Sequence, residues 1–230
     1  MTEEKHKNIE QKSIWGSECT PDMDIEYNSC IGYVQTPGWN FLNHEILNCF
    51  KSFNDLNTIE LGCGLGKVSL LFSILGSKTI LLDYSVKQLS SAKFIHEKFD
   101  NHPEVIEGNL LDLPESLYNR FDISMSFGTA EHFFGKERSL VFESHYKVLK
   151  KGGISIIWVP NKYCFLFHLG RNIRKCIGKS YSKADETPFT RKELYKYAQK
   201  AGFKNIKIQG GTTIASDFNR SIINLPAVPE

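Results

Sequence analysis

Short apolar runs alternate with longer amphipathic stretches from residue 58 onward. The runs predict strands at 58–61, 79–82, 104–106, 121–126, 153–159 and 204–209, and the stretches predict helices at 67–75, 85–98, 138–149 and 190–201. Strands that alternate with helices are typical of an α/β fold with a doubly wound, mostly parallel sheet and helices on both faces. The run 154–159 is apolar apart from Ser155, as expected for a strand that is covered on both faces.

Two regions fall outside this alternation. Apolar residues near helical spacing predict a helix over 40–52. We assign residues 1–55 to an N-terminal extension and helical lid, ahead of a main domain over 56–230; the alternative is that this helix simply covers the sheet. After the fifth strand, an aromatic stretch joins a basic one, and we expect a cap insertion at about 161–185 that covers a site or a partner surface. Beyond residue 209, only 212–214 and 221–223 are candidates for a last, antiparallel strand.

Composition and charge narrow the class of protein. The chain has 230 residues, of which 41% are hydrophobic and 23% charged, as in ordinary globular proteins. It has no apolar run of membrane-spanning length and no apolar signal core at its start, which favours the cytoplasm. No C-x-x-C pair occurs among the six cysteines, and we expect reduced thiols and no metal site.

The formal net charge of +2 hides an asymmetry. Residues 1–135 hold 10 Lys and Arg against 19 Asp and Glu, whereas residues 136–207 hold 17 against 5. A basic half can face an acidic substrate, an anionic membrane or nucleic acid, or it can be a solvated, lysine-rich surface.

Three glycines, Gly62, Gly64 and Gly66, follow the first strand directly and precede a helix. Glycine permits a turn with φ > 0, close approach of a ligand to the backbone, and tight packing of helix on strand. The second strand ends in Asp83, 17 residues after Gly66, where a carboxylate can accept both hydroxyls of a ribose. Ser85 is then a suitable N-cap for the next helix.

The ligand of this turn is better matched by an adenosyl amino acid than by a dinucleotide. The dinucleotide fingerprint G-x-G-x-x-G needs a glycine where Lys67 stands. Glu60, just before the turn, would repel a pyrophosphate but would attract an ammonium group.

With these residues the sequence resembles the class I S-adenosylmethionine-dependent methyltransferases, which have a Rossmann-like fold. The motifs that carry the resemblance lie at 59–66, 82–85, 107–114, 121–126, 149–153, 189–194 and 201–203, so that it covers roughly residues 56–210. The pattern is most similar to the small-molecule branch, which includes quinone-biosynthesis and sugar methyltransferases.

The resemblance implies S-adenosylmethionine as the cofactor. The implied cofactor-binding residues are Glu60, Gly62, Cys63, Gly64, Gly66, Asp83, Tyr84, Asn109, Leu110, Ser126 and Phe127. Within this set the glycine turn and Glu60 would hold the methionine end, Asp83 the ribose and Tyr84 the adenine. Asn109 departs from the aspartate usual in the family, and its uncharged oxygen implies weaker binding of the adenine amine.

His132 is the candidate general base, paired with Glu131 in the segment after the fourth strand. The carboxyl edge of an open α/β sheet is where ligands bind, and histidine titrates near neutral pH. The alternative is that this pair shapes a helix start without transferring a proton. His145 and His168 are weaker candidates, His145 because its helix resembles a surface helix and His168 because its aromatic stretch can be a packed cap.

We therefore predict in-line transfer of a methyl group from S-adenosylmethionine to a small molecule, at oxygen ahead of nitrogen or carbon. The acceptor is expected to be apolar, anionic or both, with a possible peripheral membrane contact through 161–183; no oligomeric state is predicted. The alternatives are a non-catalytic module that binds S-adenosylmethionine or a partner, and a nucleic-acid methyltransferase. Nucleic acid is not expected, because Ser126-Phe127-Gly128-Thr129 stands where such enzymes carry an Asn/Asp-Pro-Pro-aromatic motif.

Overall fold

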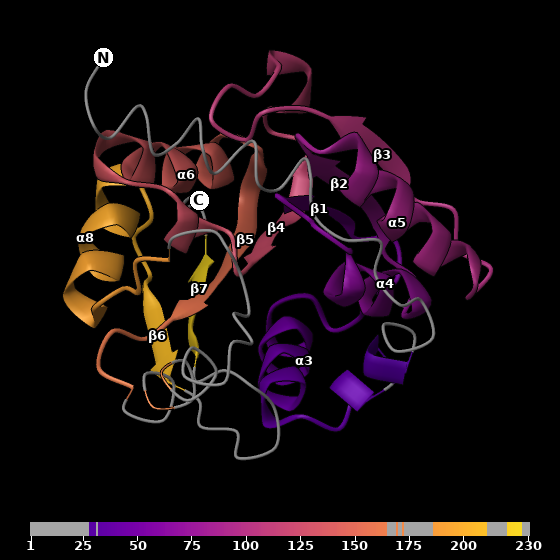
Figure 1. The fold of residues 1–230 in the computed structure, drawn as a ribbon, viewed down its shortest axis with the longest axis horizontal. Helices are drawn as coiled ribbons and strands as arrows, with labels where there is room; N and C mark the ends of the chain where they lie inside the picture. The colour runs from indigo at the N-terminus through magenta and orange to yellow at the C-terminus, as the bar shows by residue number, and fades with distance from the viewer. Residues whose placement is uncertain are drawn as a thin grey trace.

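The fold is a seven-stranded sheet with the order β3-β2-β1-β4-β5-β7-β6 (Figure 1). A computed structural model describes residues 28–30, 32–164, 169, 172, 186–210 and 220–226. The strands are β1 (Asn57–Leu61), β2 (Lys78–Asp83), β3 (Glu104–Glu107), β4 (Phe121–Phe127), β5 (Leu149–Pro160), β6 (Lys207–Gly210) and β7 (Arg220–Pro226). Strands β1 to β5 are parallel, and β7 lies antiparallel between β5 and β6. The expected doubly wound α/β sheet is confirmed, and a last antiparallel strand is present. Of its two candidates, 221–223 lies in β7 and 212–214 lies outside the described residues.

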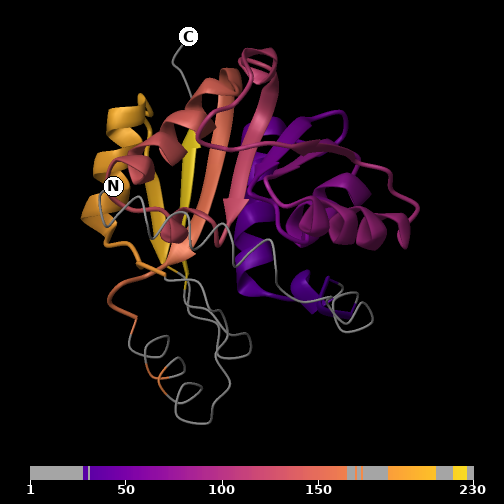
Figure 2. The same cartoon turned by 45° about the horizontal axis from the view of Figure 1, so that its top comes forward.

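In the described part of the chain, the five helices with defined bounds cover the two faces of the sheet. They are α3 (Pro37–Phe50), α4 (Lys67–Ile74), α5 (Val86–Glu97), α6 (Gly135–Lys147) and α8 (Arg191–Ala201). Helices α6 and α8 pack on one face, and α3, α4 and α5 lie on the other (Figures 1 and 2). Sequence signals fix their starts: Ser85 caps α5 as expected, and Thr190 forms a capping box with Glu193 at α8.

Helix α3 belongs to the core of the sheet. It begins at Pro37 after the N-cap Thr36, and it buries Trp39, Leu42 and Ile46. These side chains join one apolar cluster with Ile123, Met125 and other residues of β4 and β5. The helix expected at 40–52 is thus present, and it packs on a sheet face. Residues 1–27 lie outside the described part of the chain, so the lid and the domain limit at 55 stay predictions.

Two local interpretations of the sequence are wrong. The helix expected over 138–149 ends at Lys147, and β5 begins at Leu149; Gly152 lies inside β5 with φ +82°, next to an irregularity in the β4–β5 pairing. His145 does not lie on a surface, because α6 turns it into the core, where it is fully buried. Its ring nitrogens lie 3.1 Å from Ser124 Oγ and 3.0 Å from Ser126 Oγ, and burial lowers the pKa of His145 to about 3. Polar neighbours in the strand, not solvent, therefore satisfy this ring.

The predicted cap at 161–185 falls largely outside the described residues, but its base is well defined. Phe189 N–H donates to Pro160 O, and Lys162 N–H donates to Phe189 O, both at 2.9 Å. The chain that leaves β5 is thus hydrogen-bonded to the chain that enters α8. No helix within the described ranges is long and apolar enough to cross a membrane.

Candidate functional site

The glycine turn between β1 and α4 has a specific backbone geometry. Gly62, Gly64 and Gly66 all have positive φ, at 72°, 52° and 62°. The N–H groups of Gly62 and Cys63 both donate to Leu82 O, at 2.8 and 3.0 Å, so the turn is attached to the end of β2. A side chain at Gly64 would meet no atom within 4 Å, whereas one at Gly62 would lie 2.4 Å from Thr129 Cγ2. The turn is therefore closed on its inner side and open at Gly64.

Asp83 lies beside this opening. One carboxylate oxygen accepts from Gly64 N–H and the other from Ser85 N–H, each at 2.9 Å. The residue is only 7% exposed, and burial raises its pKa while these N–H groups oppose the rise. Each carboxylate oxygen retains capacity for a further donor, such as a hydroxyl.

Glu60 lies beneath the turn at the end of β1. It is 3% exposed, and Ser69 Oγ on α4 donates a short hydrogen bond to Glu60 Oε2. Burial raises the pKa of Glu60 to about 8, so the free protein holds this carboxyl largely protonated at neutral pH. A cation brought next to it would favour its ionised form.

Two residues that were not predicted from the sequence, Thr129 and His96, hydrogen-bond the turn from either side. Thr129, just after β4, donates its hydroxyl to Gly62 O at 2.9 Å. His96, buried on α5, places Nε2 3.0 Å from Gly66 O and Nδ1 3.1 Å from Asn101. Burial lowers the pKa of His96, which favours a neutral ring whose Nε2–H donates to Gly66 O. Both residues are far from the glycines in the sequence and lie next to them only in the folded chain.

The other predicted cofactor residues surround the same edge in different environments. Leu110 and Cys63 are buried, Tyr84 and Phe127 are half-buried, and Asn109 is exposed. The Asn109 side-chain oxygen accepts from Leu111 N–H at 3.0 Å and thereby shapes the turn after β3.

Ser126 is the predicted residue whose side chain points away from this edge. Its hydroxyl is directed into the core, 3.0 Å from His145 Nε2. Only the backbone of Ser126 is therefore placed to meet a ligand.

Glu131 and His132 lie on a short 3-10 turn, η2 (Ala130–His132), directly after Thr129. Glu131 is 1% exposed, and its carbonyl accepts from Thr187 N–H at 2.9 Å. Arg138 of α6 is close enough for its charge to interact with Glu131, and its guanidinium donates a short hydrogen bond to Thr187 O. His132 is half-buried. Glu131 is thus buried, and its backbone carbonyl ties η2 to the segment that precedes α8.

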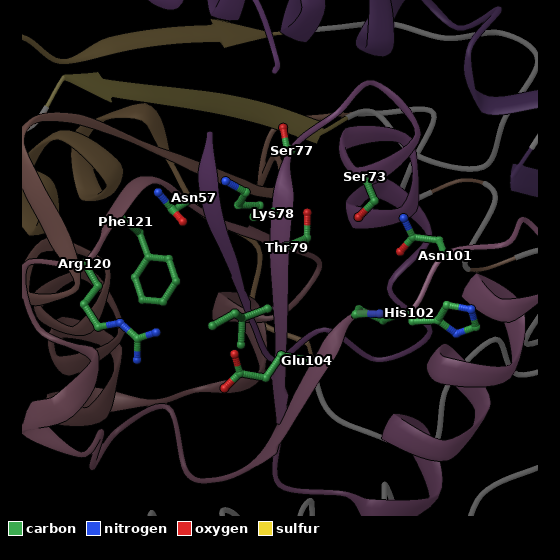
Figure 3. A pocket seen from close by; sticks show the side chains of 12 residues that line it. Asn57, Ser73, Ser77, Lys78, Thr79, Asn101, His102, Glu104, Arg120 and Phe121 are labelled. Atoms are coloured by element: carbon green, nitrogen blue, oxygen red, sulfur yellow. The ribbon is translucent and has the colours of Figure 1, made fainter. Parts of the chain in front are cut away.

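A cavity of about 400 Å³ opens at the opposite edge of the sheet. Figure 3 shows Asn57, Lys78 and Glu104, on the first residues of β1, β2 and β3, around it. None of the predicted site residues lines this cavity. It lies at the amino ends of the strands, whereas ligands of open α/β sheets bind at the carboxyl ends.

The described residues contain no cluster of three or more His, Cys, Asp or Glu side chains that could hold a metal ion.

Comparison with known proteins gives a family match over most of the chain. The family described as "Methyltransferase domain" matches residues 52–202. An uncharacterized methyltransferase, YbaJ, of Bacillus subtilis is 27% identical over 118 residues. That stretch is 51% of this chain and 46% of the relative, so the match spans less than half of the relative's length.

Solved structures share the fold at low identity. Magnesium protoporphyrin IX methyltransferase from Synechocystis PCC 6803, with bound SAH (S-adenosylhomocysteine), has a TM-score of 0.63 at 17% identity, covering 94% of this chain and 92% of that one. A possible histamine N-methyltransferase from Thermotoga maritima has a TM-score of 0.57 at 21% identity, covering 79% and 86%. At these identities the likeness concerns the fold alone.

Proposed function

Because the chain belongs to the methyltransferase domain family, whose cofactor is S-adenosylmethionine, we infer that it transfers a methyl group from S-adenosylmethionine to a small molecule. This inference rests on one observation: the glycine turn, Asp83 and Glu60 lie together at one edge of the sheet. S-adenosylmethionine supplies a methyl group already activated on a sulfonium. The C–S bond breaks as the bond to the acceptor forms, and the electron pair stays on sulfur.

The residues present fit this cofactor. The open space at Gly64 admits a ligand to the backbone, and the neighbouring Asp83 carboxylate can accept two ribose hydroxyls. Glu60 offers a buried acid to the ammonium group of the methionine end. The backbone of Ser126 and Phe127 ends β4 on the same edge, and Tyr84 and Leu110 complete the adenine side.

We propose oxygen as the accepting atom, with His132 as the base that takes the hydroxyl proton. A general base is needed only if the acceptor starts protonated, and an imidazole titrates in the right range for a phenol or an enol. The buried Glu131 would then position η2 through Arg138, without touching the acceptor. The names of two structural relatives refer to magnesium protoporphyrin IX and histamine, which supports an acceptor of small-molecule size.

The test of the proposed function is turnover. Purified protein with S-adenosylmethionine should release S-adenosylhomocysteine when phenols, catechols and enols are added, with a product heavier by one methyl group by mass spectrometry. His132→Gln should lower kcat by about 100-fold, the usual share of a general base, and leave cofactor binding unchanged. Tight cofactor binding with no turnover across amine and hydroxyl acceptors would instead indicate a non-catalytic binding module.

Cofactor binding should depend on pH through Glu60. In the free protein its pKa is about 8, so at pH 6 few molecules carry the charge that an ammonium group requires. The affinity for S-adenosylhomocysteine should therefore rise by up to about tenfold per pH unit between pH 6 and 8, with release of up to one proton.

Calorimetry in buffers of different ionisation enthalpy measures this proton release. Glu60→Gln should bind more weakly and lose the pH slope. A wild-type affinity that stays flat over this range would contradict the role of Glu60.

A further inference from the structure

Trp158 lies in the buried stretch of β5, two residues before this strand ends at Pro160, and one strand beyond the end of β4. It is the register partner of Phe127, the last residue of β4. Their rings lie 5.9 Å apart at 53°, and the ring of Tyr33 lies 6.3 Å from Trp158 at 52°. Phe127 and Tyr33 are both half-buried, so this wall of three rings reaches the surface at the edge of the sheet.

The indole ring is fixed in place by the first turn of α3. A Cβ atom at Gly38 would lie 2.2 Å from Trp158 Cη2, so that only glycine allows the helix to approach so closely. The indole is therefore held in one orientation before any ligand arrives, which lowers the entropic cost of binding.

The indole N–H has no hydrogen-bond partner among the described residues. Trp158 is 9% exposed, and its Nε1 is buried. An indole nitrogen can only donate, and a buried donor without an acceptor costs free energy. Because most buried polar groups are satisfied, an unsatisfied one in a preorganised aromatic wall indicates a missing ligand atom.

The position of Trp158 separates it from the cofactor's ribose end. Gly128 N–H donates to Trp158 O at 2.9 Å, and Thr129, the next residue, donates to Gly62 O. Trp158 is therefore linked to the glycine turn through two hydrogen bonds made by adjacent residues, Gly128 and Thr129. In the order β2-β1-β4-β5, the ends of β2 and β5 are three strand spacings, about 14 Å, apart. Because Asp83, at the end of β2, is assigned to the ribose, the end of β5 lies on the side of the methyl acceptor.

We propose that Trp158 is a specificity-determining residue that binds the methyl acceptor. Its indole N–H donates to an oxygen of the acceptor, and the rings of Trp158, Phe127 and Tyr33 contact a flat, unsaturated part of the same molecule. The acceptor class is thus a planar oxygen compound, such as a phenol or an enol. This inference rests on the proposed function of methyl transfer.

The test compares wild type with Trp158→Phe, which keeps a ring but removes the donor. The probe is the phenol that the wild type turns over with the highest kcat/KM. Its KM should rise about fivefold in Trp158→Phe, the equivalent of one hydrogen bond of about 1 kcal/mol, with kcat and the Kd for S-adenosylhomocysteine unchanged. Trp39→Phe is the matched control, because Trp39 stacks on Phe53 inside the same cluster, and all three constants should stay at wild-type values.

A second measurement covers the case in which Trp158→Phe folds poorly. In wild-type protein labelled with ¹⁵N and saturated with S-adenosylhomocysteine, the three indole N–H resonances are followed while the phenol is added. The Trp158 resonance, assigned by its neighbour contacts, should shift, and the Trp39 resonance should not.

Several results would overturn the inference. An unchanged KM in Trp158→Phe or an unshifted Trp158 resonance would show that Trp158 does not contact the acceptor. Weaker S-adenosylhomocysteine binding in Trp158→Phe would assign the N–H to the cofactor, and turnover of amines but no phenol would reject the acceptor class. If wild-type protein binds no S-adenosylmethionine, the proposed function fails instead.

Discussion

Replacing Asp83 by alanine should abolish measurable binding of S-adenosylmethionine. The proposed ribose contacts are two hydrogen bonds to a carboxylate, and each such bond contributes about 1.5–3 kcal/mol, so Kd should rise at least about 100-fold. The same change removes the acceptors for Gly64 N–H and Ser85 N–H, so two backbone hydrogen bonds at the site are lost as well. Asp83→Asn keeps one acceptor oxygen, replaces the other by an NH2 donor and removes the charge, so its affinity should fall between those of wild type and Asp83→Ala.

Calorimetry with S-adenosylhomocysteine and thermal unfolding with and without it measure this effect. Asp112→Ala is the matched control, because Asp112 is an exposed carboxylate in the turn after β3 and should leave binding unchanged. Equal ligand-induced stabilisation of wild type and Asp83→Ala would disprove the ribose assignment. Loss of binding in Asp112→Ala would indicate that the carboxylate of Asp112, in the turn after β3, binds the adenosine.

Alanine at Gly62 should mainly lower the stability of the protein, whereas alanine at Gly64 should mainly prevent ligand binding. At Gly62, the added Cβ would lie 2.4 Å from Thr129 Cγ2 at φ +72°, so both a clash and backbone strain lower the free energy of unfolding, by about 2–4 kcal/mol. At Gly64, φ is +52° but no atom lies within 4 Å, so only about 1–2 kcal/mol of strain is expected. The methyl group there occupies the ligand's space, and Gly64→Ala should be folded but unable to bind.

Urea unfolding and ligand binding separate these effects. Gly152→Ala is the matched control for Gly64→Ala. Gly152 also has positive φ with open space around it, but it lies near the start of β5, away from the glycine turn. This variant should lose similar stability and keep full binding. If Gly64→Ala binds S-adenosylhomocysteine as well as Gly152→Ala does, the ligand does not approach the backbone at Gly64.

The sequence allowed the fold to be predicted because its strands are short apolar runs separated by glycine and capping signals. The glycine turn, Asp83 and the Ser85 cap are local features whose residue types are forced by backbone geometry. Strand β7 was harder to anticipate, because a short antiparallel strand has little periodicity of its own. The apolar content of α3 predicted the helix but not its partner, which is the face of β4 and β5.

The supporting residues of the site could not be predicted for a physical reason. His96 and Thr129 act through single hydrogen bonds to Gly66 and Gly62, and their sequence separation carries no signal for contact. His145 carried a misleading signal, because α6 is polar in composition although this position is buried. The unsatisfied N–H of Trp158 appears only once its surroundings are folded.

The paired hydrogen bonds at Pro160, Lys162 and Phe189 have a consequence for how this protein can change. They fix both ends of the segment between β5 and α8 at one point of the scaffold. The entropic cost of closing a loop grows only slowly with its length, so once the ends are fixed, insertions, deletions or exchange of this segment cost little stability. The length and sequence of this segment can therefore change during evolution at little cost to the sheet and to the glycine turn, which lie outside it.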